Sequence, residues 1–215
     1  MPQIGFSNHQ KTGVVYVVDD DDDARDSLIW LLEGNGFKVS AHESAERFLL
    51  ALQNADSTTP ACALLDHRLP GITGLELHTQ LIERGHQIPV AFITGHADVQ
   101  LAVQAIKQGA QDFIEKPFKE EQICDLVTIM LNKAYVDYQK SQEMNAIRKK
   151  IKTLTKREQE VLDCLTKGCT NKEVGQNLQI SLKTVEAHRA NVMNKLGVNR
   201  AANLLKLSIT NKQFH

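Results

Sequence analysis

Short hydrophobic runs alternate with helical patterns along the first half of the chain. The runs at 14–18, 37–41, 61–65, 89–93 and 112–114 are short enough to be strands, and aliphatic runs of this kind are typical of strands buried on both faces. Apolar residues at helical spacing follow each run, at 24–35, 45–53, 74–84, 98–108 and from about 119 onward. Five successive βα units predict an α/β domain with a doubly wound, five-stranded parallel sheet.

The pattern then changes to helices alone. Helical spacing continues beyond Glu120 and turns polar after Tyr135 with no glycine or proline, which predicts a long helix that leaves the first domain. Met144, Ile147, Ile151 and Leu154 follow a 3-4-3 spacing. A short coiled-coil seam is therefore an alternative to a solvated connector, although the stretch is shorter than a coiled coil normally requires.

Capping signals after Leu154 predict a cluster of short helices. Thr155 with Glu158, and Thr170 with Glu173, have the spacing of capping boxes. Ser181 is expected to cap a third helix, and a fourth is expected after Asn199. The inward face of the third helix carries Val185, His188, Val192 and Leu196.

Charge is distributed unevenly between the two parts. The first 133 residues carry 10 Lys and Arg against 19 Asp and Glu, a balance of −9, whereas residues 134–215 carry 15 against 7, a balance of +8. The whole chain has 215 residues and a net charge of only −1. Length and asymmetry together indicate two domains, the first suited to a cation and the second to a polyanion.

Several classes of protein are excluded at this stage. Apolar residues make up 42% of the chain and charged residues 24%, a globular balance. The four cysteines include no C-x-x-C pair, which disfavours a zinc or thiol-redox site. No hydrophobic run approaches the ~20 residues of a membrane helix, and no signal peptide is evident. We therefore expect a cytoplasmic protein with reduced cysteines and no membrane partner.

Carboxylates, a hydroxyl and an amine follow successive predicted strands. Asp19 and Asp20 come after the first strand, Asp66 after the third, Thr94 at the end of the fourth and Lys116 after the fifth. Ligands of such sheets bind beyond the carboxyl ends of the strands, where the strand order reverses. Three carboxylates gathered there need a hard cation such as Mg²⁺. The set fits phosphoryl transfer, in which a carboxylate attacks while metal and amine neutralise the phosphoryl oxygens.

These motifs resemble the receiver domain of two-component response regulators. The resemblance covers roughly residues 12–135 and rests on VVDDD (17–21), DHRLPGITGLEL (66–77), PVAFITGHADVQLAVQAIKQGA (89–110) and DFIEKPF (112–118). It implies a flavodoxin-like fold and a phosphoacceptor at Asp66, phosphorylated by a sensor histidine kinase. It also implies a cis Lys116–Pro117 bond. The implied site residues are Asp19, Asp20, Asp66 and the Arg68 carbonyl for Mg²⁺, Thr94 and Lys116 for the phosphoryl oxygens, and Phe113 as the switch aromatic.

One residue departs from the family pattern. His67 follows the phosphoacceptor, where the family usually has an aliphatic residue. Its imidazole either packs or faces solvent, or, if charged, alters the lifetime of the acyl phosphate.

The second half resembles the LuxR-type helix-turn-helix from 154 to 200, and the whole architecture resembles the FixJ/NarL-type regulators, closest to the FixJ-type branch. In such a motif the third helix presents its outer face to DNA. Lys183 and Thr184 suit phosphate contacts, and Glu186, Ala187 and Ala190 suit base edges, with Arg189 at the border of that face. The inward side chains are not expected to contact DNA bases, because they face the core: Val185, Val192 and Leu196.

The expected organisation is a receiver at 12–133, a helical linker at 134–150 and a helix-turn-helix domain at 151–215. The expected function is a DNA-binding transcription regulator, with a sensor kinase, promoter DNA and, as a further candidate, RNA polymerase as partners. Phosphorylation is expected to promote a homodimer through the face that carries Val103 and Lys107. We expect no enzyme beyond Mg²⁺-dependent self-phosphorylation and dephosphorylation of Asp66. The alternatives are an aspartyl-phosphate phosphohydrolase and a receiver that acts through protein contacts alone.

Overall fold

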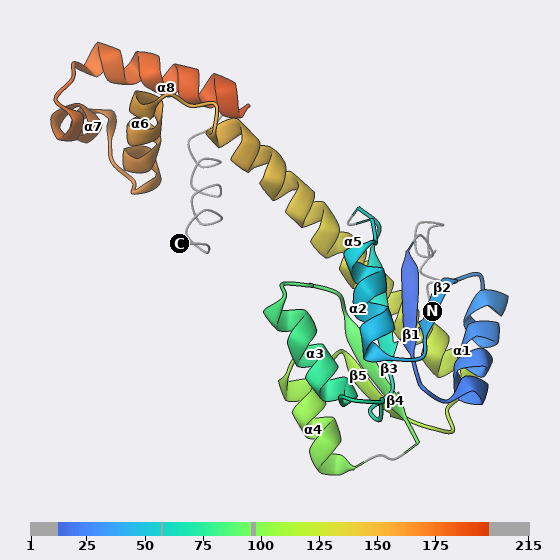
Figure 1. Cartoon of the computed structure of the whole chain (residues 1–215). Helices are drawn as coiled ribbons and strands as arrows, with labels where there is room; N and C mark the ends of the chain where they lie inside the picture. The colour runs from blue at the N-terminus through green and yellow to red at the C-terminus, as the bar shows by residue number, and fades with distance from the viewer. Residues whose placement is uncertain (1–12, 57, 96–97, 198–215) are drawn as a thin grey trace, which may run out of the picture. The chain divides into compact units, whose positions relative to one another are not determined.

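A five-stranded parallel sheet organises the first part of the chain in the computed structural model, which describes residues 13–56, 58–95 and 98–197. The strands are β1 (Val14–Val18), β2 (Lys38–His42), β3 (Ala61–Leu65), β4 (Val90–Thr94) and β5 (Asp112–Glu115). Their order is β2-β1-β3-β4-β5 (Figure 1), and every neighbouring pair is parallel. The order reverses between β1 and β3, so their carboxyl ends flank the position where such sheets bind ligands. The predicted doubly wound α/β fold is confirmed.

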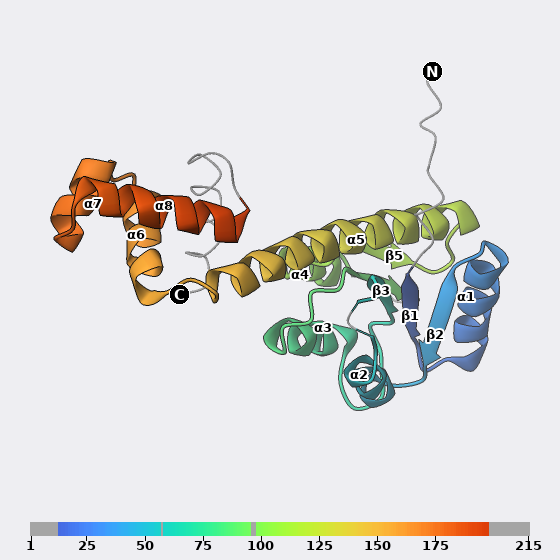
Figure 2. The same ribbon diagram turned by 90° about the horizontal axis from the view of Figure 1, so that it is seen from above.

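Helices cover both faces of this sheet (Figure 2). On one face, α1 (Asp22–Gly34) and α5 (Glu120–Ile151) pack on Val15 and Val17. On the other, α2 (Ala45–Gln53), α3 (Gly74–Glu83) and α4 (Val99–Lys107) pack on Tyr16 and Val18. Strand β1 therefore buries alternate side chains in two separate cores, which is why its sequence is a continuous hydrophobic run.

The first helix begins at Asp22, two residues before the predicted start at 24. Asp21 is its N-cap, because the Asp21 Oδ1 atom accepts a hydrogen bond of 3.1 Å from the Ala24 backbone N–H. Asp22 and Asp23 then lie in the first turn, where the helix dipole favours negative charge. Part of the acidic run thus caps and begins the helix.

The predicted long helix is confirmed as α5, which has 32 residues. Its buried side chains lie within Ile123–Ala134, on the face toward the sheet. The chain divides into two compact units between Tyr138 and Gln139, inside this helix. Despite the length of α5, no helix in the described ranges is apolar enough over a sufficient length to span a membrane.

Three further helices form the core of the second unit: α6 (Lys156–Thr166), α7 (Asn171–Leu178) and α8 (Leu182–Leu196). Both capping boxes are present, and the Ser181 hydroxyl caps α8. Ile151 and Leu154 pack with Leu162, Val192 and Leu196, so these two residues belong to this core rather than to a coiled-coil seam. The predicted fourth helix after Asn199 lies outside the described residues.

Candidate functional site

The carboxyl ends of β1 and β3 bring two aspartates together. The register pairs Val18 with Leu65, and the Asp66 N–H donates a 2.8 Å hydrogen bond to the Val18 carbonyl. Asp19 and Asp66, the residues that follow these strands, are only 2% and 8% exposed. Two buried carboxylates next to each other require a cationic partner, because burial of unpaired charge is costly.

Lys116 is that partner. Its Nζ lies 2.6 Å from Asp19 Oδ2 and 3.8 Å from Asp66 Oδ1. The backbone N–H of Lys116 donates to the Thr94 carbonyl at 2.8 Å, which ties the end of β5 to the end of β4. The Lys116–Pro117 bond is cis, as the resemblance implied. The structure therefore gathers four of the predicted site residues, Asp19, Asp66, Thr94 and Lys116, at one edge of the sheet.

The Asp66 carboxylate is poised between opposing influences. Burial raises its pKa above the ordinary value, and the negative charges of Asp19 and Asp20 add to this effect. The Arg68 backbone N–H, which donates to Asp66 Oδ2 at 2.7 Å, and the Lys116 ammonium act in the opposite direction. A carboxylate that is destabilised by burial yet held in place is well suited to act as a nucleophile.

The loop after β3 depends on a glycine that sequence reasoning assigned only as a helix start. The Gly74 N–H donates to the His67 carbonyl at 2.8 Å, and a Cβ atom at Gly74 would stand 2.2 Å from the Asp66 carbonyl oxygen. Only glycine permits this approach of α3 to the end of β3. The position of Gly74 in the GITGLEL segment was the available signal, but no pattern in the sequence reports a backbone contact.

His67 is half-buried, and its Nδ1 has no hydrogen-bond partner among the described residues. The ring therefore packs partly against protein, one of the expected alternatives. Its effect on phosphoryl lifetime stays a prediction.

The predicted metal ligands fit Mg²⁺ by their chemistry. Asp19, Asp66 and the Arg68 carbonyl are oxygen donors, as Mg²⁺ prefers, and the Asp19–Asp66 pair already holds one cationic group. Asp20 is exposed at the rim of the same corner. In the described residues, no three His, Cys, Asp or Glu side chains stand together as a ready ligand set. The donor types fit, and the assignment of Asp20 as a ligand stays a prediction.

The predicted switch pair lies on neighbouring strands. Thr94 is 1% exposed at the end of β4. Phe113, on β5, is half-buried and packs on Phe92 with ring centroids 6.1 Å apart. Thr94 and Phe113 thus lie on adjacent strands, and the switch role of Phe113 stays a prediction.

The predicted dimer face lies on α4. Val103 and Lys107 are exposed, and Val99 and Ile106 on the same helix are exposed as well, at 78% and 48%. Such a hydrophobic group on a helix surface is typical of a contact site. Dimerisation through this face stays a prediction.

The second unit presents its predicted DNA-contacting residues on α8. Lys183, Glu186, Ala187 and Ala190 are exposed, and Thr184 is half-buried beside the Ser181 hydroxyl. Arg189 is half-buried, and its Nη1 donates to Asn171 Oδ1 of α7 at 2.8 Å. Val185, Val192 and Leu196 are buried, as predicted, whereas His188 is only half-buried. Arg189 thus links the two helices of the motif, a role that its sequence position did not indicate.

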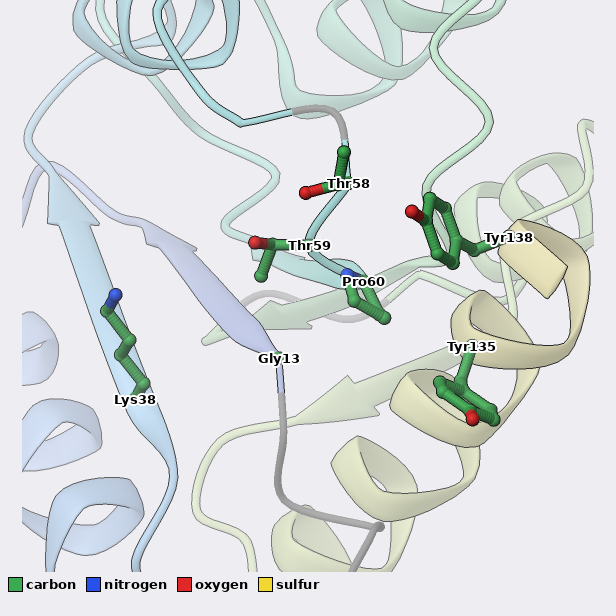
Figure 3. A pocket seen from close by; sticks show the side chains of 7 residues that line it. All are labelled: Gly13, Lys38, Thr58, Thr59, Pro60, Tyr135 and Tyr138. Atoms are coloured by element: carbon green, nitrogen blue, oxygen red, sulfur yellow. The ribbon is translucent and has the colours of Figure 1, made fainter. Parts of the chain in front are cut away.

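A cavity of about 380 Å³ lies at the opposite, amino edge of the sheet (Figure 3). It contains none of the predicted site residues, because its lining lies before or at the start of the strands or on α5. The lining residues are Gly13, Lys38, Thr58, Thr59, Pro60, Tyr135 and Tyr138. This cavity is therefore not where the phosphoryl chemistry is expected.

Two family models match the chain in succession. The response regulator receiver domain matches residues 15–128, and the luxR family of bacterial regulatory proteins matches residues 152–208. The first match contains the acidic corner, and the second contains α6, α7 and α8.

Two curated relatives match this chain over most of its length. The transcriptional regulatory protein FixJ of Azorhizobium caulinodans is 42% identical over 195 residues, 91% of this chain and 91% of that protein. The transcriptional regulatory protein TdiR of Thauera aromatica is 39% identical, over 91% of this chain and 86% of that protein.

Solved structures of response regulators align with most of this chain. The response regulator StyR aligns with a TM-score of 0.75 at 36% identity, over 92% of this chain and 98% of that one. Full-length FixJ from B. japonicum aligns with a TM-score of 0.56 at 34% identity, over 94% and 98%. The chain belongs to the response regulators that join a receiver domain to a LuxR-type DNA-binding domain, and it is a transcriptional regulator of that family.

Proposed function

We propose that a sensor histidine kinase phosphorylates Asp66 and that the phosphorylated chain dimerises and binds promoter DNA. The observation that carries this proposal is the buried Asp19–Asp66 pair around the Lys116 ammonium. Receiver domains generally use Mg²⁺, and we assign it here to Asp19, Asp20, Asp66 and the Arg68 carbonyl. When bound, the ion would neutralise charge on the phosphoryl oxygens.

In the transfer itself, an Asp66 carboxylate oxygen attacks the phosphorus of the donor. The bond from phosphorus to the donor nitrogen or oxygen breaks, and the donor leaves with that electron pair. The Arg68 N–H holds Asp66 Oδ2 in place during the attack. Lys116, within 3.8 Å of Asp66 Oδ1, would attract a transferred phosphoryl oxygen. The Thr94 hydroxyl, at the end of the neighbouring strand, would donate a hydrogen bond to a phosphoryl oxygen.

We further propose that phosphoryl chemistry in this chain is limited to Asp66 itself. A phosphohydrolase needs a general acid or base and room for a substrate beside the nucleophile. His67 is the candidate next to Asp66, and the described cavity lies at the other edge of the sheet. Together with the match to a DNA-binding family, these features favour a regulator over an enzyme. A receiver that acts by protein contacts alone is disfavoured by the exposed polar face of α8.

Labelling by acetyl phosphate with Mg²⁺ tests the acceptor. Wild-type protein should gain one phosphoryl group by intact mass, and Asp66→Asn should gain none. Asp56→Asn is the matched control, because Asp56 is an exposed aspartate outside this site. Labelling of Asp66→Asn to the wild-type extent would move the acceptor to another residue.

Two assays separate the rival functions. A gel shift on promoter fragments should show salt-dependent binding that phosphorylation strengthens. Repeated turnover of a generic phosphate ester, with no DNA binding, would instead establish the phosphohydrolase.

A further inference from the structure

Arg25 reaches from α1 into the acidic corner. Its Nη1 donates to the Asp19 backbone carbonyl at 2.8 Å, and its Nη2 pairs with the Asp22 carboxylate. The Arg25 side chain is 16% exposed, far less than the 83% of Asp22. A guanidinium held this way by two partners has a fixed orientation, since its planar fork matches both acceptors at once.

The turn that Arg25 contacts carries the exposed metal ligand. The Asp19 N–H donates to the His42 carbonyl at 3.2 Å, and the Asp21 N–H donates to Asp19 Oδ1 at 3.1 Å. The Arg25 bond to the Asp19 carbonyl fixes the peptide between Asp19 and Asp20 itself. Because Asp20 is exposed, its direction depends on the backbone that bears it.

We propose that Arg25 is a positioning residue for the metal site, which fixes the Asp19–Asp20 peptide so that the Asp20 carboxylate meets the cation. The proposal rests on the proposed function, because it assumes that Asp20 is a Mg²⁺ ligand. Arg25 itself touches neither metal nor phosphoryl group in this scheme. It acts through the peptide that it holds, as outer partners of metal ligands commonly do.

Charge and geometry predict opposite effects of Arg25 on Mg²⁺ affinity. Arg25 is a cation beside a run of five aspartates, so as a charge alone it repels Mg²⁺ and its loss should strengthen binding. As a positioning residue it organises a ligand, so its loss should weaken binding. A lysine keeps the charge but lacks the planar fork that bonds both the Asp19 carbonyl and Asp22. Arg25→Gln and Arg25→Lys together therefore distinguish the two roles.

The experiment measures Mg²⁺ affinity of the full-length chain directly. The melting temperature is recorded over a series of MgCl₂ concentrations. A ligand that binds the folded state raises the melting temperature, and the rise grows with the logarithm of its concentration relative to the dissociation constant. The dissociation constant for Mg²⁺ should rise about tenfold in both Arg25→Gln and Arg25→Lys. The melting temperature without Mg²⁺ serves as the control for a purely structural effect.

Labelling by acetyl phosphate gives a second readout. The Mg²⁺ concentration for half-maximal labelling should rise in both variants, while the rate at saturating Mg²⁺ should stay near the wild-type rate. A general loss of folding would instead lower the rate at saturating Mg²⁺ together with the melting temperature without Mg²⁺. Arg84→Gln is the matched control, because Arg84 is an exposed arginine at the end of α3 whose loss changes the net charge equally. It should leave the Mg²⁺ affinity unchanged.

Three outcomes would overturn the inference. Tighter Mg²⁺ binding in Arg25→Gln with unchanged binding in Arg25→Lys would show that Arg25 acts as a charge. Unchanged binding in both variants would show that the Arg25 bond to Asp19 has no role at the metal. A fall in the rate at saturating Mg²⁺ with unchanged affinity would place Arg25 in the transfer step instead. If labelling and melting temperature of the wild-type chain show no dependence on Mg²⁺, the proposed function itself is wrong. The wild-type protein alone gives that result, so it is distinct from a failure of the Arg25 proposal.

Discussion

At the scale of single residues, His78 is a buried titratable group in the receiver core. It is 4% exposed on α3 and meets Phe92 edge-on, with ring centroids 5.9 Å apart. Its Nδ1 has no hydrogen-bond partner within the part of the chain that the structure describes. Burial lowers the pKa of the imidazole below its ordinary value of 6.5, so the folded chain keeps it neutral.

His78 should make the receiver sensitive to acid. Below pH 6.5 the unfolded chain binds a proton on His78 that the folded chain does not, so stability falls as the pH falls toward the lowered pKa. His78→Leu removes the proton and the unpartnered nitrogen, which should add about 1 kcal/mol at pH 7. The advantage should grow at pH 5, measured by urea unfolding at both pH values. Parallel changes of stability in variant and wild type between pH 7 and pH 5 would contradict the role of His78.

At the scale of elements, the start of α3 sets the end of β3. Gly74→Ala places a Cβ atom 2.2 Å from the Asp66 carbonyl oxygen and 3.1 Å from Phe92 Cε1, so α3 or the Asp66 peptide must move. We expect a loss of about 1–3 kcal/mol by urea unfolding, as for other overpacked sites, and slower labelling by acetyl phosphate.

Gly34→Ala is the control for that change. No atom lies within 4 Å of a Cβ at Gly34, so this substitution should be neutral or stabilising by about 0.4–1 kcal/mol. Equal effects of the two substitutions would mean that the close approach at Gly74 is easily relieved.

The recognition helix supplies the next prediction. Lys183 lies in the first turn of α8 and is exposed, which suits a phosphate contact that is independent of base sequence. Lys183→Gln should weaken binding about equally on different promoter fragments and reduce the slope of log affinity against log salt by about 1. Gel shifts over a series of salt concentrations measure both quantities. Lys167→Gln, an exposed lysine at the end of α6, should change neither, and an equal change would indicate a general charge effect.

At the scale of the whole molecule, phosphorylation should change the oligomeric state. Val103 is 46% exposed on α4 beside Val99 and Ile106, so a charge there would be buried without a partner in a dimer. Phosphorylated wild-type protein should sediment as a dimer, and phosphorylated Val103→Asp should remain a monomer with normal labelling. Leu50→Asp makes the same change at an exposed position of α2 and should dimerise normally. Dimerisation of Val103→Asp at wild-type strength would place the interface elsewhere.

The sequence by itself determined the architecture. Val14–Val18 reads as a doubly buried strand because its alternate side chains enter two cores, and this requirement leaves a continuous hydrophobic run. Thr155, Thr170 and Ser181 begin helices where predicted, because a capping side chain bonds to a backbone only three residues away. The expected site also followed from the sequence, since parallel strands place their carboxyl ends at one edge.

Only the tertiary structure decided how those residues meet. The 2.6 Å approach of Lys116 to Asp19 joins residues 97 apart in the chain, and no local pattern encodes such a distance. Other roles depend on contacts between separate elements. Gly74 and Arg25 each lie against the backbone of another segment, and Arg189 bonds to Asn171 of another helix. Periodicity and capping are local because they depend on neighbours along the chain, whereas these contacts depend on the packing of separate elements. The raised pKa of Asp66 has the same origin, because burial is a property of the folded chain and not of the aspartate.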